Sequence, residues 1–439
     1  MGGGPIGTFD PGHMTLSPRR SACAERQRSQ RTTDPARQPP GKGPLIAALG
    51  RVCNVALGQG GGCDDIVRPG ARGAAARDRR AAGTGPGVPR GDAVHGPCRQ
   101  LADRGRPRVQ PAAGRAGLGR HDPPREYGGH GRSPLERFVV VEELLAAGAP
   151  VGAHWIADRQ TGPSILAHGT EEQKRRFLPA IARGECFFAI GMSEPDSGSD
   201  LASVRTRAER DGDGWRLRGT KVWTSGAHLA HAILVLARSA PAARERHEGL
   251  SQFIVTLPDE RVAIRPIRGL SGEHHFNEVV LDGVFVPDAM VLGRAGDGWR
   301  QVTAELAYER SGPERLLSTF MLVRLLHGRA GGPAARRALG GLTARLWSLR
   351  QASLAVAGAL ARGETPELPA ALVKDLGTRF EREVIEVARE HAGVEPDPGS
   401  PDPLARALAG AVVQAPGFTL RGGTNEILRG IVARGLGVR

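Results

Sequence analysis

Two stretches near the middle of the chain decide the fold: Ile190-Gly-Met-Ser-Glu-Pro-Asp-Ser-Gly-Ser-Asp-Leu201 and, shortly after it, Gly219-Thr-Lys-Val-Trp-Thr-Ser-Gly-Ala227. The first predicts a loop rich in hydroxyl groups, in which Gly198 allows the backbone to approach a ligand closely. Its serines and backbone N–H groups can bind a polar ring edge or a phosphate. The second predicts a strand end where the Trp223 ring covers a planar cofactor and the Ser225 hydroxyl reaches a ring nitrogen. Composition alone favours a simpler interpretation, two ordinary β-turns and one core tryptophan.

The segments around these stretches change from helical to strand periodicity and back. Apolar residues recur at helical spacing in 135–147, and Thr170-Glu-Glu-Gln173 is a capping box that begins a second helix. Period two runs from about Cys186 to Leu292 and predicts about five to seven short strands. Helical patterns return in 298–327, 333–361 and 368–392, and a last helix is expected near Asn425. We predict an α+β fold with a helical N-terminal part (123–185), a central β-barrel-like domain (186–295) and a C-terminal α-helical bundle (296–439).

The first 122 residues differ in composition from the rest of the chain. Residues 1–125 carry 21 Lys and Arg against 9 Asp and Glu, a net charge of +12 out of the chain's +14. Arg, Gly, Pro and Ala dominate this part, and such a segment cannot bury enough apolar surface to offset its ordering entropy. Two interpretations stay open: a disordered basic tail that touches nucleic acid or anionic lipid, or sequence read out of frame from a GC-rich gene. We favour the second, and because the remaining 314 residues carry only +2, we predict no nucleic-acid partner.

Cysteine usage and apolar patterning favour a cytoplasmic location. Four of the five cysteines, Cys23, Cys53, Cys63 and Cys98, lie in the basic segment at spacings that match no zinc or redox motif, so we expect no metal site. Cys186 is predicted to be a small buried residue. The N-terminus shows no apolar core of a signal peptide, and no run approaches the ~18 apolar residues of a membrane span.

Together with three further segments, the two central stretches resemble those of acyl-CoA dehydrogenases, flavoproteins that use FAD to desaturate an acyl-CoA thioester between its α and β carbons. The further segments are Arg125-Glu-Tyr-Gly-Gly129, Gly162-Pro-Ser-Ile-Leu-Ala-His-Gly-Thr170 before Glu172-Gln-Lys, and Arg421-Gly-Gly-Thr-Asn-Glu-Ile-Leu-Arg429. They follow one another in the order that the family has. The resemblance implies a homo- or hetero-oligomer with FAD at subunit interfaces, and an electron-transfer flavoprotein as electron acceptor.

The resemblance also implies roles for individual residues. For the cofactor, Met192 and Ser193 would meet the pyrimidine end of the isoalloxazine, Trp223 would lie against the ring, Ser225 would lie near N5, and Thr424 and Glu426 would approach from the C-terminal loop. For the acyl-CoA substrate, Ser199 would face the thioester channel, and Arg310 belongs to the same substrate-binding group.

The reaction needs a base that removes the α-proton of the thioester. Many members of the family place a glutamate directly before the Gly-Thr of the C-terminal loop, where this chain has Gly422. A minority, similar to the isovaleryl-CoA and long-chain types, carry it on the first long C-terminal helix directly before an arginine, as in Tyr308-Glu309-Arg310. We therefore predict Glu309 as the base, with Glu305 as a weaker candidate.

Helical spacing places Glu309 on the same face as Val302 and Leu306, so we expect desolvation to raise the pKa of its carboxyl. Pro313 removes the amide that would bond the Glu309 carbonyl, and we expect the backbone to kink there. The alternative is that Glu309 forms a structural pair with a neighbouring arginine.

Two further departures from the family pattern keep rival functions open. The Arg-x-x-Phe-Gly segment by which many relatives bind the FAD pyrophosphate of a neighbouring subunit is missing, and Gly328–Gly341 is rich in Ala, Gly and Arg instead. The helices that relatives carry before the Tyr-Gly-Gly segment are also missing, so we expect an incomplete N-terminal domain. The rivals are a related flavoenzyme that uses oxygen, a non-catalytic subunit of a mixed oligomer, and an inactive product of a disrupted gene.

Overall fold

The computed structural model describes residues 123–149, 152, 155–329 and 331–438, and all of these fall within one structural unit. Along the described chain the elements are helical, then β, then helical, which confirms the predicted fold class. The basic segment 1–122, with the four cysteines and the predictions made for it, lies outside the described residues.

A short helical part precedes the sheet. It consists of the 3₁₀ turn η3 (Arg125–Tyr127), α3 (Pro134–Ala146), the π-helical turn η4 (Ala157–Thr161), α4 (Gly162–His168) and α5 (Glu171–Ala182). Both longer helices begin at a capping box, in which the Ser133 and Thr170 hydroxyls each accept a backbone N–H three residues later, at 3.2 Å. The capping box predicted at Thr170 is therefore confirmed.

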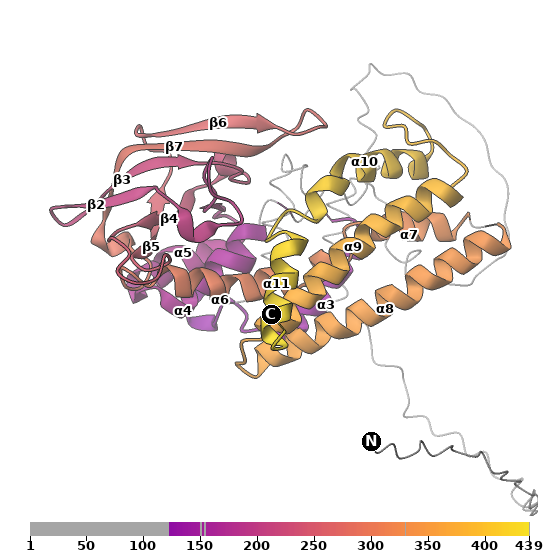
Figure 1. Ribbon diagram of the computed structural model, residues 1–439, viewed down its shortest axis with the longest axis horizontal. Helices are drawn as coiled ribbons and strands as arrows, with labels where there is room; N and C mark the ends of the chain where they lie inside the picture. Colours follow the sequence, from indigo (N-terminus) through magenta and orange to yellow (C-terminus); the bar gives the residue numbers. More distant parts are fainter. Residues whose placement is uncertain (1–122, 150–151, 153–154, 330, 439) are drawn as a thin grey trace, which may run out of the picture. The chain divides into compact units, whose positions relative to one another are not determined.

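Seven strands form one sheet in the middle of the described chain. They are β1 (Phe188–Gly191), β2 (Arg207–Asp211), β3 (Gly214–Lys221), β4 (Ala232–Arg238), β5 (Leu250–Thr256), β6 (Val262–Arg268) and β7 (His274–Pro287), with the 3₁₀ turns η5 (Leu201–Ser203), η6 (Ala227–Leu229) and η7 (Asp288–Met290) between or after them. The order is β1-β4-β2-β3-β7-β6, with β5 paired to β4 (Figure 1). The order does not return to β1, so the predicted barrel-like domain is an open half-barrel.

The C-terminal part is a group of helices. They are α6 (Gly298–Ser311), the 3₁₀ turn η8 (Pro313–Arg315), α7 (Phe320–His327), α8 (Pro333–Ala361), α9 (Glu367–His391), α10 (Pro403–Phe418) and α11 (Asn425–Gly435). The patterns at 333–361 and 368–392 and the start near Asn425 are confirmed to within one residue. The pattern at 298–327 is wrong as a single helix, because Gly312 and Pro313 end α6 after Ser311 and Pro313 begins η8.

Helix α10 was not predicted from the sequence. Its residues are largely alanine and other apolar residues on all faces, so no helical stripe stands out. The start signal is nevertheless present, because the Asp402 side chain accepts the Leu404 N–H at 2.9 Å and Pro403 occupies the first helical position.

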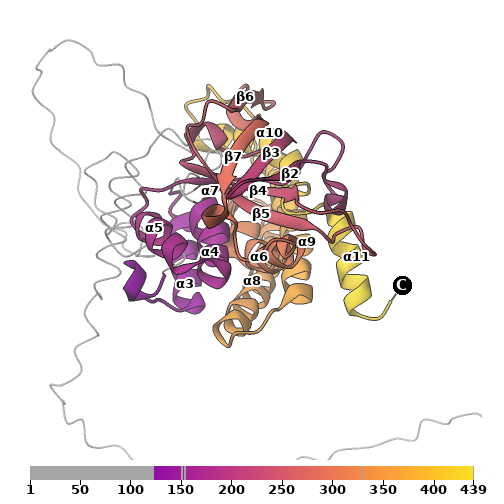
Figure 2. The same cartoon turned by 90° about the vertical axis from the view of Figure 1, so that its left-hand side faces the viewer.

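The helices of the N-terminal part belong to two large apolar clusters, one shared with the C-terminal helices and one shared with the sheet. Val140, Val141, Leu144 and Leu145 of α3 pack with the helices α7 to α10. Ile165, Phe177, Leu178 and Ile181 of α4 and α5 pack with the sheet instead. Figure 2 shows α4 and α5 side by side, and Figure 1 shows α8 and α9 running alongside each other. The junction between the two clusters is where the site described below lies.

Three further observations concern Cys186, membrane-spanning helices and metal-binding groups. Cys186 is buried, as predicted, and burial raises the pKa of its thiol to about 11. In the part of the chain that the structure describes, no helix has the length and apolar character needed to cross a bilayer. The same residues contain no group of three or more side chains that could hold a metal ion.

Candidate active site

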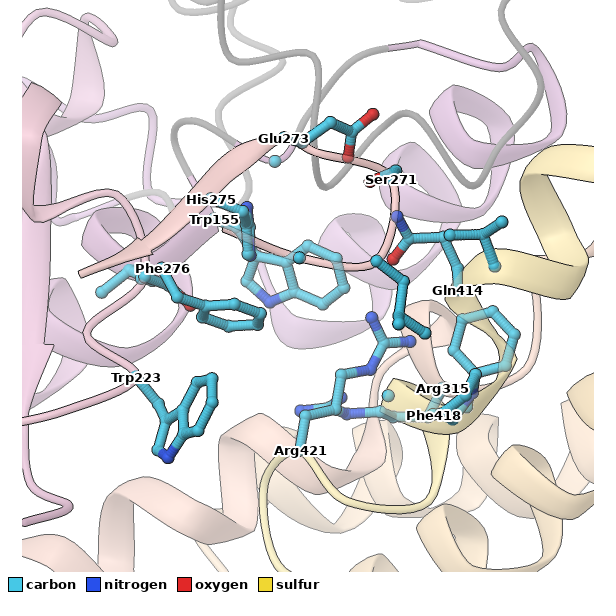
Figure 3. Close-up of a pocket in the computed structure, with 18 of the residues that line it drawn as sticks. Trp155, Trp223, Ser271, Glu273, His275, Phe276, Arg315, Gln414, Phe418 and Arg421 are labelled. Atoms are coloured by element: carbon cyan, nitrogen blue, oxygen red, sulfur yellow. The ribbon is translucent and has the colours of Figure 1, made fainter. Parts of the chain in front are cut away.

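A cavity of about 410 Å³ lies where η4, the turn between β6 and β7, the end of α6 and the end of α10 meet. Its lining combines aromatic side chains with charged ones: Trp155, Arg159, Trp223, Ser225, His275, Phe276, Glu309, Arg315, Phe418 and Arg421. Figure 3 shows Trp223 and Phe276 on one side of the opening, with Arg421 and Phe418 on the other. Apolar cavities with a few convergent polar groups are the usual form of a small-molecule site.

Glu309 lies in the last turn of α6 and lines this cavity. The residue is only 8 % exposed, and Val302, on the same helix face, is 1 % exposed. The inward orientation expected from the helical spacing is thus present. The pairing with an arginine, which was the alternative interpretation, is present as well, but that arginine is Arg315 and it also lines the cavity.

Arg315 holds Glu309 at two points. Its Nη2 donates to the Glu309 carboxylate Oε1 at 2.5 Å, and its Nε donates to the Glu309 carbonyl at 3.0 Å. In a regular helix that carbonyl would accept the N–H of residue 313, which Pro313 lacks. The proline therefore leaves the carbonyl available to Arg315, and the two bonds fix the direction of the carboxylate.

The charges around Glu309 decide its protonation state. Burial raises the pKa of its carboxyl, but the cations Arg315, Arg159, Arg310 and Lys374 together outweigh burial and hold this pKa below its usual value. The expectation of a raised pKa is therefore wrong, because it considered the apolar stripe of α6 and not cations from distant segments. The carboxylate is ionised at neutral pH, which is the form a base requires.

Glu305, one turn earlier on α6, has the opposite protonation behaviour. It is 3 % exposed and does not line the cavity. Desolvation, and next to it the negative charge of Glu309, raise the pKa of Glu305 to about 8. It keeps its proton at neutral pH, so Glu309 rather than Glu305 has the form and the position of a base.

Replacement of Glu305 by Gln is expected to stabilise the protein at alkaline pH. Between pH 4.5 and 8 the folded state holds a proton on Glu305 that the unfolded chain releases, so its contribution to stability is present below pH 4.5 and is lost as the pH rises. Gln stays neutral throughout, so the variant should be more stable than the wild type at pH 8, by about 4 kcal/mol at most, and no more stable near pH 4.5. Urea unfolding at both pH values measures this. Glu390→Gln, at an exposed glutamate, is the control; a Glu305→Gln curve with the wild-type pH dependence would contradict the buried, protonated carboxyl.

Trp223 has a strained backbone and an exposed ring. Its φ is 58°, in the left-handed region that residues other than glycine rarely adopt. The residue is 59 % exposed, and its ring meets Phe276 edge to face with centroids 5.7 Å apart. Ser225 lines the same cavity. Strain and an exposed aromatic beside a cavity are features that proteins retain for ligand binding, and here they fit a flat ring lying against Trp223.

The C-terminal glycine loop, residues 421–424, lies against Glu309. A Cβ atom at Gly422 would come within 2.7 Å of the Glu309 Oε1, and the φ of Gly422 is +68°. Arg310 holds this loop, because its Nε donates to the Gly422 carbonyl at 3.2 Å, and it does not line the cavity. A side chain at Gly422 would therefore need the space that the Glu309 carboxylate occupies.

Five other residues predicted from the sequence do not line the cavity: Met192, Ser193, Ser199, Thr424 and Glu426. The carbonyl of Met192 accepts Lys221 Nζ at 3.0 Å and the carbonyl of Ser193 accepts the Val222 N–H at 2.9 Å, so the two central stretches are bonded together. The Thr424 hydroxyl caps α11, and Ser199 and Glu426 are exposed. Their roles toward cofactor and substrate stay predictions.

Sequence analysis missed most of the cavity wall. Trp155 lies just before η4 and Arg159 within it, His275 and Phe276 come from β7, and Phe418 ends α10. The Arg159 guanidinium stacks on Trp155, 4.1 Å from the ring centroid. These residues share no motif or spacing that a sequence could display.

Three models of one protein family match successive parts of the chain. They are described as the acyl-CoA dehydrogenase N-terminal domain, at residues 98–185, the middle domain, at 189–284, and the C-terminal domain, at 316–437. The first match begins upstream of residue 123, where we predict that the family pattern starts.

Named relatives and solved structures agree with these models. Acyl-CoA dehydrogenase FadE29 of Mycobacterium tuberculosis is 37% identical over 335 residues, covering 73% of this chain and 84% of the relative. Acyl-CoA dehydrogenase IpdE1 of the same organism is 37% identical over 320 residues, covering 71% and 82%. The structure titled Tcur3481-Tcur3483 steroid ACAD is 32% identical with a TM-score of 0.70 and covers 78% of this chain and 91% of its own. The ChsE4-ChsE5 complex from Mycobacterium tuberculosis is 29% identical with a TM-score of 0.68, covering 78% and 94%.

The fold and its relatives define a flavoprotein oxidoreductase. More narrowly, the chain belongs to the acyl-CoA dehydrogenase family, and it is an acyl-CoA dehydrogenase. The resemblance drawn from the sequence is confirmed.

Proposed function

We propose that this chain binds FAD and an acyl-CoA thioester in the 410 Å³ cavity, and that Glu309 removes the α-proton of the thioester. The observation that carries the proposal is the Glu309 carboxylate on the cavity wall, held by Arg315. Bound FAD would supply a hydride acceptor for the β-carbon. Among the chain's own residues, Trp223 and Ser225 would bind the isoalloxazine ring, and Arg315 would orient the base.

The geometry of Gly422 supports Glu309 against a base on the C-terminal loop. A side chain at Gly422 would collide with the Glu309 carboxylate. The C-terminal loop and α6 therefore cannot both place a carboxylate here. A carboxylate that reaches this space from α6 can therefore act where relatives with a loop glutamate place theirs.

Replacement of Gly422 by Ala tests whether a side chain at this position displaces the Glu309 carboxylate. The new Cβ would displace the Glu309 carboxylate, and we expect kcat to fall by about tenfold to a hundredfold, since a shift of about 1 Å in a reacting group has effects of that size. Steady-state kinetics with an acyl-CoA measure it. The control is Gly131→Ala, since Gly131 has a matching φ of +66° and no atom within 4 Å of its Cβ position. Gly131→Ala should leave kcat unchanged, and equal kcat in the two variants would contradict the collision of the Gly422 Cβ with Glu309.

We also propose that the acyl group is bulky, such as one carried by a steroid. The cavity wall contains Trp155, Phe276 and Phe418, and wide aromatic walls favour flat or branched apolar groups over a thin chain. A solved relative at 32% identity is titled a steroid ACAD.

The assembly and the electron acceptor follow from the same relatives as proposals. The ChsE4-ChsE5 complex and the Tcur3481-Tcur3483 steroid ACAD each carry the names of two proteins, and we propose that this chain also assembles as an oligomer, with itself or with a homologue. An electron-transfer flavoprotein would accept the electrons. If a homologue in a mixed oligomer carried the base, this chain would be a supporting subunit; Glu309 in the cavity favours a catalytic role.

Purification of the full chain followed by anaerobic titration with acyl-CoA thioesters tests the proposal. We expect a yellow protein whose flavin absorbance is bleached by a steroid-bearing or branched acyl-CoA faster than by a straight-chain one. Protein that lacks flavin and does not take up added FAD would contradict the proposal and favour an inactive gene product. Bleaching that occurs only together with a co-purified homologue would favour the supporting subunit, and oxygen consumption during turnover would favour an oxygen-using flavoenzyme.

A further inference from the structure

Asn277, near the start of β7, ties this strand to the segment that carries Trp223. Asn277 is completely buried. Its side-chain Nδ2 donates to the Thr224 carbonyl at 2.9 Å, and its backbone carbonyl accepts the Thr224 N–H at 3.0 Å. Both backbone polar groups of Thr224, the residue after Trp223, are thus bonded to one asparagine.

Two histidines fix the orientation of the Asn277 carboxamide. The Asn277 Oδ1 lies 2.7 Å from Nε2 of His274 and 3.2 Å from Nδ1 of His228. The two imidazole rings are stacked, with centroids 3.7 Å apart and an angle of 20° between their planes. An amide oxygen can only accept, so two imidazole N–H donors on Oδ1 leave the NH₂ group directed at Thr224. The carboxamide therefore cannot flip without breaking bonds on both sides.

Trp223 depends on its backbone for its position, because its ring is mostly exposed. The left-handed conformation of Trp223 costs free energy for a side chain with a Cβ, so the neighbouring bonds must compensate. On the preceding side, the Val222 N–H donates to the Ser193 carbonyl at 2.9 Å. On the following side, the bonds to Asn277 are the compensating contacts.

We propose that Asn277, held by His228 and His274, is a positioning residue that sets Trp223 against the flavin ring. This inference rests on the proposed function, since it takes FAD as the ligand of Trp223. Asn277 is not among the residues that line the cavity, so its effect would pass through the backbone of Thr224.

A double-mutant cycle on FAD affinity tests the proposal. The four proteins are the wild type, Asn277→Ala, Trp223→Ala and the double variant, each purified as the full chain and titrated with FAD. Loss of the Trp223 ring is expected to weaken FAD binding about fivefold to tenfold. Asn277→Ala should weaken it about fivefold alone, but less than about twofold in the Trp223→Ala background, because two residues that act through one contact are not additive.

A second arm keeps the proposal testable if Asn277→Ala does not fold. His274→Gln retains an amide N–H that can donate to the Asn277 Oδ1, whereas His274→Ala removes the donor. The half-buried His274 tolerates both changes more readily than the buried Asn277 does. We expect FAD affinity near the wild-type value for His274→Gln and about twofold to threefold weaker binding for His274→Ala, since one of two donors is lost. Thermal unfolding of each variant shows whether a weaker affinity reflects unfolding.

Each outcome separates this inference from the proposed function. Additive effects of Asn277→Ala and Trp223→Ala, unchanged FAD affinity in either single variant, or equal affinities for the two His274 variants would overturn the positioning role. Such results would leave FAD binding by the wild type intact. A wild-type chain that does not bind FAD would instead remove the proposed function, and the inference with it.

Discussion

Replacement of Glu309 by Gln is expected to abolish reduction of the bound flavin by acyl-CoA. The side chain keeps its size and its place on the cavity wall, but its carboxylate becomes a neutral amide, which is too weak a base to accept the α-proton. A positioned general base contributes about 10²- to 10⁴-fold to a rate, so we expect the rate constant for flavin bleaching to fall by about 10³-fold or more. Stopped-flow absorbance in anaerobic buffer measures this rate constant.

The controls for this variant separate chemistry from folding. Glu305→Gln changes the same atoms one turn away, outside the cavity, and should bleach at close to the wild-type rate. Glu309→Asp keeps the charge but withdraws the carboxylate by one methylene, and an intermediate rate is expected. Because the Glu309→Gln change leaves Arg315 without its balancing charge, FAD retention and thermal unfolding are recorded on the same preparations. A Glu309→Gln protein that bleaches within threefold of the wild-type rate would falsify the assignment of the base.

Replacement of Arg315 by Met is expected to have the largest effect on stability. Arg315 is 1 % exposed and makes two hydrogen bonds to Glu309. Removal of one partner of a buried ion pair leaves the other charge uncompensated, which costs about 3–5 kcal/mol. Urea unfolding at pH 7 measures the loss. The same variant should retain little activity, since the carboxylate of Glu309 loses its fixed direction.

The destabilisation caused by Arg315→Met is expected to increase with pH. In the wild type the folded-state pKa of Glu309 is lowered, so its contribution to stability is present above the unfolded pKa of about 4.5 and is lost as the pH falls through the folded pKa. Without Arg315 that pKa rises, so the destabilisation should be greater at pH 7 than at pH 4. The acid limb of kcat/KM should move to higher pH for the same reason.

A matched pair elsewhere in the chain controls for the loss of any arginine. Arg350 pairs with Glu142 at 2.5 Å, but its side chain is 30 % exposed and lies outside the cavity. Arg350→Met should cost at most about 1 kcal/mol and leave the pH profile unchanged, because partly exposed ion pairs are screened. If Arg315→Met were no more destabilising than Arg350→Met, the buried clamp on Glu309 would not exist in solution.

The comparison of Glu309 with Gly422 shows how far sequence reasoning reaches. Spacing along α6 placed Glu309 on the inner face, because helical periodicity is a local property. The predicted direction of the Glu309 pKa shift was wrong. Arg159 and Lys374, which help to lower this pKa, come from η4 and α9, far away in sequence. The sequence also showed that Gly422 carries no base, but only the fold shows that this glycine leaves the space that Glu309 fills.

The helical, β, helical order of the chain, the capping box at Thr170 and the family were determined by the sequence alone. Hydrophobic period, capping residues and short motifs act between residues a few positions apart, so they can be read without a structure. The cavity, the clamp of Arg315 on Glu309 and the network around Asn277 were decided by the tertiary structure. They depend on side chains that packing brings together from segments far apart, and the free energies of such contacts come from burial and charge, which no local pattern records.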